Sequence, residues 1–297
     1  MDGQLLLRIY HQLFDPGKLR CPPGCIFSDS LIVLIQLLGV LSGRSPRWAC
    51  QKHNWPLWMR RMGAPSYSQF IRRLKSPSVL ELIQEVNAQA RAGLPQSKEK
   101  FCDGKPLSVG GFSKDPDTRE GRLPGDGWGR GYKLHVIVDA CGAVELFCIS
   151  ALNGGEPTHM ALLVKQAAST GLFAEVTLRG DSAYDSNPLY AAVSEAGGRL
   201  IATRKRPGTG LGHSTKHHPD RLRAIAELEA SDEAGRAHRR LRILVEQVLG
   251  HMTNLPFGLT PLPNFVRRLR RVQLWVLSKI TLYHLYLNLR AQQKLAA

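Results

Sequence analysis

One stretch of the sequence constrains the fold more than any other, because it has the pattern of an antiparallel β-hairpin. In residues 132–138, apolar side chains alternate with Lys133 and His135, which is the period of a strand with two unlike faces. Residues 139–142 (Asp-Ala-Cys-Gly) have the composition of a tight turn, and residues 144–150 can return as the second strand.

The segments around this hairpin alternate between strand and helix. A short strand is expected within residues 101–109, before a loop rich in Gly and charge at 110–131. A helix, a strand, a helix and a strand are expected after the hairpin, over residues 158–170, 175–179, 187–196 and 199–203, and further helices begin near Ser231 and Phe265. This order predicts an α/β domain with a mixed sheet flanked by helices.

The first part of the chain lacks strand patterns and is expected to be helical. Ser28 or Asp29 can cap a helix that runs to Leu41 and is ended by Gly43. Polar residues crowd together just before residue 100, as in a boundary between domains. The expected division is a helical module over 1–95 and an α/β domain over 96–297, with a basic insertion at 204–230 and a C-terminal helix.

The charge balance points to a polyanionic partner. Forty Lys and Arg against 24 Asp and Glu give a formal net charge of +16, an excess that favours nucleic acid or an anionic surface. The longest apolar run, residues 31–41, is shorter than the roughly 20 residues that cross a bilayer. The N-terminus also lacks the pattern of a signal peptide. We therefore expect nucleic acid and no membrane, and six cysteines fit a reducing cytoplasm.

Three acidic residues are candidates for chemistry, each with a plainer alternative. Asp103 lies in the first strand, although Asp-Gly is also a common turn. Asp181 directly follows a strand, where open α/β sheets place ligands, whereas nearby Asp185 is expected to serve a helix N-terminus. Glu246 borders the apolar stripe of the helix after Ser231. Its carboxylate either turns toward the sheet or forms a surface pair with Arg242, four residues earlier.

Taken together, the three acids suit a divalent metal ion. Two strand-borne aspartates and a helix-borne glutamate would form an all-oxygen site of the kind that Mg²⁺ or Mn²⁺ prefers. Two such ions can activate an attacking oxygen and stabilise a leaving one in phosphodiester chemistry. A zinc site at Cys21, Cys25, Cys50 and His53 is not expected, because two prolines restrict the first turn.

Several motifs resemble the bacterial insertion-sequence transposases of the DDE type. They are VGGFSKDPDTREGR (109–122), GYKLHVIVD (131–139), LRGDSAYDSNPLY (178–190) and RILVEQVL (242–249). The resemblance covers about residues 101–290, and the helical leader shares it. The block around Asp181 and the Arg-x-x-x-Glu spacing are its most specific parts.

The resemblance implies a ribonuclease H-like core with Asp103, Asp181 and Glu246 as a triad that holds two Mg²⁺ or Mn²⁺ ions, and Arg242 on substrate phosphate. A related branch of these transposases carries Tyr three residues before the Arg and Lys seven after the Glu. Arg239 and Thr253 stand at those positions here. Thr253 carries no charge, which argues against a hairpin-forming pathway like that branch's, whereas Arg239 could still hold a phosphate.

Basic residues in two other regions are candidates for DNA contacts. The helix over 66–75 could be the recognition helix of a helix-turn-helix that presents Arg72, Arg73 and Lys75. It could equally be an ordinary amphipathic helix with a basic face. The loop that begins at residue 204 carries Arg204, Lys205 and Arg206 with almost no compensating acid. These side chains are therefore expected to contact the phosphates of the DNA backbone.

These expectations combine into a transposase that cleaves the ends of an insertion element and joins them to target DNA. It would act as a homo-oligomer on paired ends, in the bacterial cytoplasm at the nucleoid. Two alternatives remain open. One is a ribonuclease H-like nuclease that cuts without strand transfer, and the other is a non-catalytic DNA-binding protein derived from a decayed element.

Overall fold

The structure is a computed structural model that describes residues 2–14, 21, 23–123, 125, 127–205, 211, 216–254, 258–259 and 261–296. It divides into two compact units. Unit 1 joins Met1–Leu94 with Met252–Ala297, and unit 2 is Pro95–His251. The boundary near residue 95 matches the expected one, but residues 252–297 group with the N-terminal module and not with the α/β unit, to which the sequence analysis assigned them.

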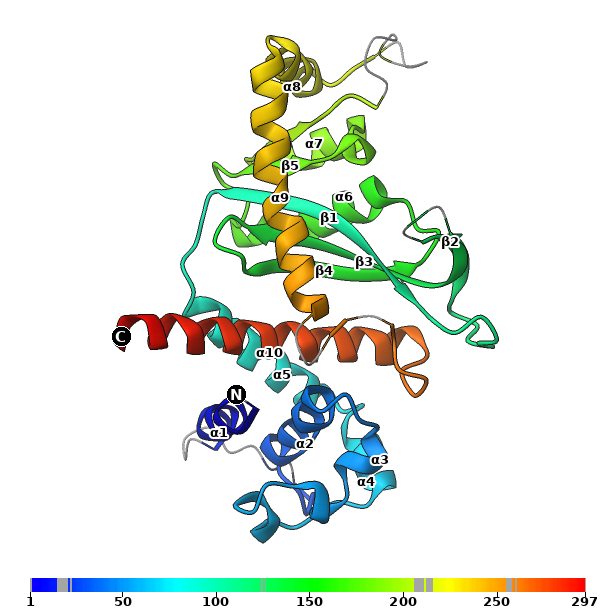
Figure 1. Cartoon of the computed structure of the whole chain (residues 1–297), viewed down its shortest axis with the longest axis vertical. Helices are drawn as coiled ribbons and strands as arrows, with labels where there is room; N and C mark the ends of the chain where they lie inside the picture. The colour runs from blue at the N-terminus through cyan, green and yellow to red at the C-terminus, as the bar shows by residue number, and fades with distance from the viewer. Residues whose placement is uncertain are drawn as a thin grey trace. The chain divides into compact units, whose positions relative to one another are not determined.

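Unit 2 is built on a six-stranded mixed sheet of described residues (Figure 1). The strands are β1 (Glu99–Ser108), β2 (Arg119–Arg122), β3 (Trp128–Asp139), β4 (Val144–Ala151), β5 (Thr177–Gly180) and β6 (Arg199–Ala202). Their order is β2-β3-β1-β5-β6, and β4 also pairs with β3. The β1–β3 and β3–β4 pairs are antiparallel, whereas β1–β5 and β5–β6 are parallel. The expected mixed sheet of ribonuclease H-like order is confirmed.

The predicted hairpin is present as β3 and β4. The carboxylate of Asp139 closes its turn by accepting hydrogen bonds from the backbone N–H groups of Cys141 and Ala143, at 2.9 and 3.0 Å. Gly142 has φ +91°, a conformation that glycine adopts at little cost. The expected loop over 110–131 differs, because it contains β2, whose residues pair with the start of β3.

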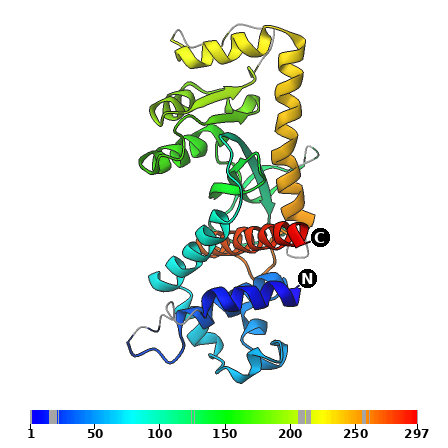
Figure 2. The same ribbon diagram turned by 90° about the vertical axis from the view of Figure 1, so that its left-hand side faces the viewer.

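Helices flank both faces of this sheet (Figure 2). On one face, α6 (Glu156–Ala167) and α7 (Asn187–Glu195) cover a core that includes Cys102, Ile137 and Leu178. On the other face runs α9 (Asp232–Asn254). Between β6 and α9, the expected basic insertion contains the helix α8 (Pro219–Glu229). Because neighbouring residues of a strand point to opposite faces, Asp103 lies on the face opposite to Cys102, which is the face that α9 crosses.

Unit 1 consists of helices from both ends of the chain. They are α1 (Asp2–Leu13), α2 (Asp29–Leu41), α3 (Pro46–Ala49), α4 (Tyr67–Arg73), α5 (Pro77–Ala92) and α10 (Leu269–Ala296). The predicted α2 is confirmed: Ser28 caps it by accepting a hydrogen bond from Leu31 N at 3.3 Å, and Gly43 follows its end with φ +61°. All residues of α2 are buried.

The C-terminal helix packs against α5, α2 and α1 of unit 1. Val272, Val276 and Ile280 lie on one stripe of α10 at four-residue spacing and are fully buried, as expected of a helix that buries one face. Buried polar groups join the same helices, since Lys279 Nζ donates to Val40 O at 3.1 Å. No helix of the described residues is long and apolar enough to cross a membrane.

Candidate active site

The candidate site lies where β1 extends beyond β5. The two strands pair at only three positions, the last of which joins Phe101 to Arg179. From Cys102 to Ser108, β1 pairs with β3 alone among the described strands. Asp103 therefore lies on the free edge of β1, and Asp181 directly follows the last residue of β5. Local strand order brings together two aspartates that are far apart in the sequence.

Asp103 is a partly buried carboxyl group in mid-strand, so the alternative of an Asp-Gly turn is wrong. Its Oδ1 accepts a hydrogen bond from Gly104 N at 2.8 Å. Burial, helped by the negative charge of Asp181, raises the pKa of Asp103 to about 6, against the opposing effects of the Gly104 hydrogen bond and the positive charge of Arg242. A cation bound nearby would favour the charged form of this partly buried carboxyl group.

Asp181 is held by its own backbone and faces an arginine. Its Oδ1 accepts a hydrogen bond from Ala183 N at 2.8 Å, which caps the short 3₁₀ helix η4 (Ser182–Tyr184). Its Oδ2 lies 3.8 Å from Nη2 of Arg242, on α9. The Arg242 side chain is 16% exposed, and its buried Nε has no hydrogen-bond partner among the described residues. This guanidinium therefore still has an unused donor next to the two aspartates.

Glu246 is not brought into contact with the aspartates. It is exposed and makes no ion pair or hydrogen bond with any described residue. It lies four residues after Arg242, and therefore one turn further along the same side of α9. The surface pair between Arg242 and Glu246 is not formed either, because Arg242 lies beside Asp181. The structure thus assembles two of the three expected acids and the arginine.

Comparison with known proteins identifies the family. Residues 100–285, well over half of the chain, match the family described as Transposase DDE domain. The chain belongs to this transposase family. Among solved structures, it is similar to a piggyBac transposase determined by cryo-electron microscopy in a synaptic complex with hairpin DNA. The TM-score is 0.50 at 11% identity, over 97% of this chain and 76% of that chain, so this likeness concerns the fold. No curated protein matches the sequence.

Transposases of this family use divalent metal ions, and the donor chemistry here fits such ions in part. Asp103 and Asp181 offer hard carboxylate oxygens. Among the described residues, however, no three His, Cys, Asp or Glu side chains are grouped closely enough to hold a metal ion. Glu246, the third acid that the sequence suggested, is exposed on α9 and is not part of such a group.

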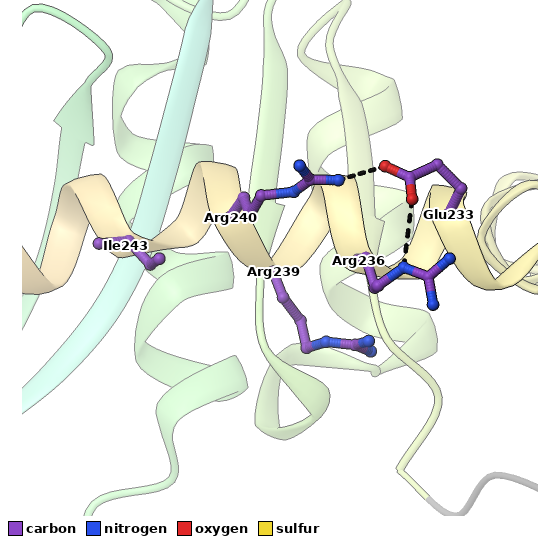
Figure 3. A pocket seen from close by; sticks show the side chains of 5 residues that line it. All are labelled: Glu233, Arg236, Arg239, Arg240 and Ile243. Atoms are coloured by element: carbon purple, nitrogen blue, oxygen red, sulfur yellow. Dashed lines mark hydrogen bonds and ion pairs between the residues drawn. The ribbon is translucent and has the colours of Figure 1, made fainter.

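A basic cleft lies on the preceding turns of α9 (Figure 3). It is lined by Glu233, Arg236, Arg239, Arg240 and Ile243. Glu233 forms ion pairs with Arg236, at 3.1 Å, and with Arg240, whereas the figure shows Arg239 extending away from this cluster. Three arginines against one glutamate leave the cleft with a net positive charge.

The DNA-binding residues expected for this transposase differ in their surroundings. Arg72, Lys75, Lys205 and Arg239 are exposed. Arg73 was expected to point outward, which is wrong: its guanidinium pairs with the buried carboxylate of Asp29. A buried carboxylate requires a cationic partner, and the Arg73 side chain is turned inward because it supplies that partner. Arg204 pairs with Glu229 at 2.8 Å, and Arg206 lies outside the described residues.

Two buried contacts of the transposase domain were missed by sequence reasoning. Asp185 does not serve a helix N-terminus as expected, because Arg221 binds its two carboxylate oxygens at 2.6 and 2.8 Å. Arg221, on α8, is itself buried, so its charge is used inside the domain. His238 of α9 is also buried and lies 3.1 Å from the carbonyl oxygen of Gly180. No local sequence pattern reveals these contacts, because Asp185 and Arg221 are 36 residues apart and Gly180 and His238 are 58 residues apart.

Proposed function

We propose that this chain is a transposase that binds the ends of a mobile DNA element, cleaves them and joins the freed 3′ ends to target DNA. The observation that carries the proposal is the meeting of Asp103 and Asp181 beside Arg242, in a chain that belongs to the DDE transposase family. Asp103, Asp181 and Glu246 are proposed to hold two Mg²⁺ or Mn²⁺ ions.

Each residue of the site has a proposed task. Asp103 and Asp181 provide oxygen ligands, and Glu246 completes the set when its side chain turns toward them from the same side of α9. Bound divalent ions supply activation of the attacking oxygen and stabilisation of the leaving one. Arg242 holds a backbone phosphate, since its side chain is partly exposed beside Asp181 and a planar guanidinium suits phosphate oxygens.

DNA binding is proposed to rest on exposed cations outside the acid site. Arg72 and Lys75 provide one patch, and Arg239 and Lys205 extend the basic surface of unit 2. The net charge of +16 supports this assignment. The similar piggyBac transposase was solved with DNA in a synaptic complex, which supports a homo-oligomer on paired ends. The proposed location is the bacterial cytoplasm at the nucleoid; the six free cysteines fit a reducing compartment.

The catalytic assignment is tested with single variants Asp103→Ala, Asp181→Ala and Glu246→Ala on duplex DNA that carries the element's own ends, with Mg²⁺. We expect each variant to lose cleavage by more than about 100-fold, since even outer partners of metal ligands contribute 10- to 100-fold. Glu195→Ala is the matched control, because Glu195 is an exposed acid on α7.

The products distinguish the proposed transposase from its alternatives. Joined products as well as nicks are expected from the unaltered protein. Nicks without joining would indicate a nuclease. Cleavage by Asp181→Ala or Glu246→Ala at the control rate would remove the site assignment. DNA binding without any metal-dependent cleavage would leave only a DNA-binding protein.

A further inference from the structure

A buried histidine connects the glutamate-bearing helix to the strand that carries Asp181. His238 lies on α9 and is 2% exposed. Its Nε2 lies 3.1 Å from the carbonyl oxygen of Gly180, the last residue of β5. Its Nδ1 lies 3.5 Å from Nη1 of Arg179, on the same strand. The imidazole therefore contacts the two residues that directly precede Asp181.

These two contacts define the protonation state of His238. A guanidinium can only donate hydrogen bonds and a carbonyl oxygen can only accept them. Nδ1 must then accept from Arg179, and Nε2 must carry the proton that it donates to Gly180. The ring is consequently neutral, in the Nε2–H tautomer. A second proton on Nδ1 would face the guanidinium of Arg179 and abolish that contact.

The charges around His238 agree with this assignment. Burial lowers its pKa, and the positive charges of Arg179 on β5 and of Arg242 and Arg239 on α9 lower it further, whereas the hydrogen bond to Gly180 opposes the shift. From β1, Glu99 faces this group through Arg179, whose Nε donates to Glu99 Oε2 at 2.7 Å. Arg179 is therefore fixed on both sides, which makes it a rigid partner for Nδ1.

The end of β5, where Gly180 contacts His238, has little freedom to move. A side chain at Gly180 would meet Cβ of Tyr184 at 2.8 Å and Sγ of Cys102 at 2.9 Å, so this backbone packs directly on the core. Arg242 follows His238 by four residues and thus projects from the same side of α9. A hydrogen bond at His238 consequently places Arg242 against Asp181.

We propose that His238 is a positioning residue that locks α9 onto the end of β5, so that Arg242 lies against Asp181 and Glu246 stands one turn further along the same side of the helix. The inference rests on the proposed function, because it assigns a task in DNA cleavage to a residue that touches neither metal nor DNA. Its physical basis is that small displacements of reacting groups cost large factors in rate.

The first test does not depend on DNA cleavage. In the full chain labelled with ¹⁵N-histidine, nitrogen chemical shifts of the His238 ring are expected to show a neutral Nε2–H tautomer at pH 7. Hydrogen exchange of residues 180–185 is expected to accelerate in His238→Leu and to remain close to the original in His238→Gln, because glutamine can still donate to the Gly180 carbonyl. An Nδ1–H tautomer, an imidazolium at pH 7, or equal exchange in the two variants would overturn the proposal.

The second test uses element-end DNA with Mg²⁺. His238→Leu is expected to lower the cleavage rate at saturating DNA by about 10- to 100-fold with DNA affinity unchanged, and His238→Gln is expected to restore most of that rate. His251→Leu and His251→Gln are the controls, because His251 is exposed on the same helix. Cleavage by His238→Leu at the original rate would overturn the positioning role.

The two tests separate this inference from the proposed function. Failure of the original protein to cleave any end DNA would remove the proposed function, and the ring chemical shifts and exchange rates would still decide whether His238 locks the helix. If His238→Leu fails to fold, the glutamine variant decides: folded protein with the original exchange supports the proposal, and accelerated exchange overturns it.

Discussion

At the scale of single residues, the buried carboxyl group of Asp103 makes stability depend on pH. Its folded-state pKa of about 6 lies above its ordinary value of 3.8. The stability associated with the protonated group is therefore fully present below pH 3.8 and is lost as the pH rises through about 6. At higher pH the charged group lies buried and close to Asp181, and the positive charge of Arg242 offsets only part of this cost.

Asp103→Asn is therefore expected to stabilise the protein in EDTA at pH 8, by at most about 3 kcal/mol. The gain should nearly disappear at about pH 3, below the ordinary pKa of 3.8, where the aspartate is largely protonated in both the unfolded and the folded chain. Urea unfolding at the two pH values measures it, with Glu195→Gln as the exposed control. A gain of equal size at both pH values would contradict the electrostatic origin.

The place of single residues could be predicted where local position decides. Asp181 was expected directly after a strand, where open α/β sheets place ligands, and it does follow β5; its role in the site stays a prediction. The inward position of Arg73 could not be predicted, because its partner Asp29 lies 44 residues away and only the packing of the folded chain shows that this carboxylate is buried. The exposure of Glu246 depends likewise on how α9 packs against the sheet.

At the scale of elements, α9 combines a buried anchor with a basic outer surface. Arg239→Ala is expected to weaken binding to DNA and to reduce the slope of log affinity against log salt by about 0.9, the value for one phosphate contact. Lys165→Ala removes an exposed charge from α6, on the other face of the sheet, and should leave the slope unchanged. Binding titrations at several salt concentrations measure both slopes, and equal slopes would remove Arg239 from the interface.

A second element, α10, buries a lysine. Burial lowers the pKa of Lys279 from 10.5 to about 7. The folded state then binds fewer protons than the unfolded chain between these values, so stability rises with pH across that window and is lower below it. Lys279→Met should raise the free energy of unfolding by about 1–3 kcal/mol at pH 6 and by less at pH 10. Thermal unfolding at both pH values tests this, and destabilisation at pH 6 would contradict it.

Elements could be predicted from the sequence where their patterns were local. The hairpin of β3 and β4 was found because alternation and turn lie within twenty residues of each other. By contrast, β2 (Arg-Glu-Gly-Arg) has no apolar alternation, and only its pairing with β3 makes it a strand. The helix α8 begins at Pro219, after a stretch rich in His and Lys that has the composition of a loop.

At the scale of the whole molecule, unit 1 depends on both ends of the chain. A fragment of residues 1–94 lacks α10 and would expose the apolar surfaces of α2 and α5 that α10 covers. Joining residues 261–297 to it through a Gly/Ser linker is expected to restore cooperative thermal unfolding, because the buried stripe of α10 returns. Circular dichroism on the two fragments measures this. Equally cooperative unfolding of the short fragment would show that α10 is dispensable.

The interrupted course of unit 1 has a consequence during protein synthesis. Domains usually fold in the order in which they leave the ribosome, but the helices that emerge first here must wait for partners encoded about 160 codons later. The central α/β unit is complete in the nascent chain before they are. Translation should therefore reverse the usual order, and chaperones have an extended period in which to meet the exposed apolar surface of the leading helices.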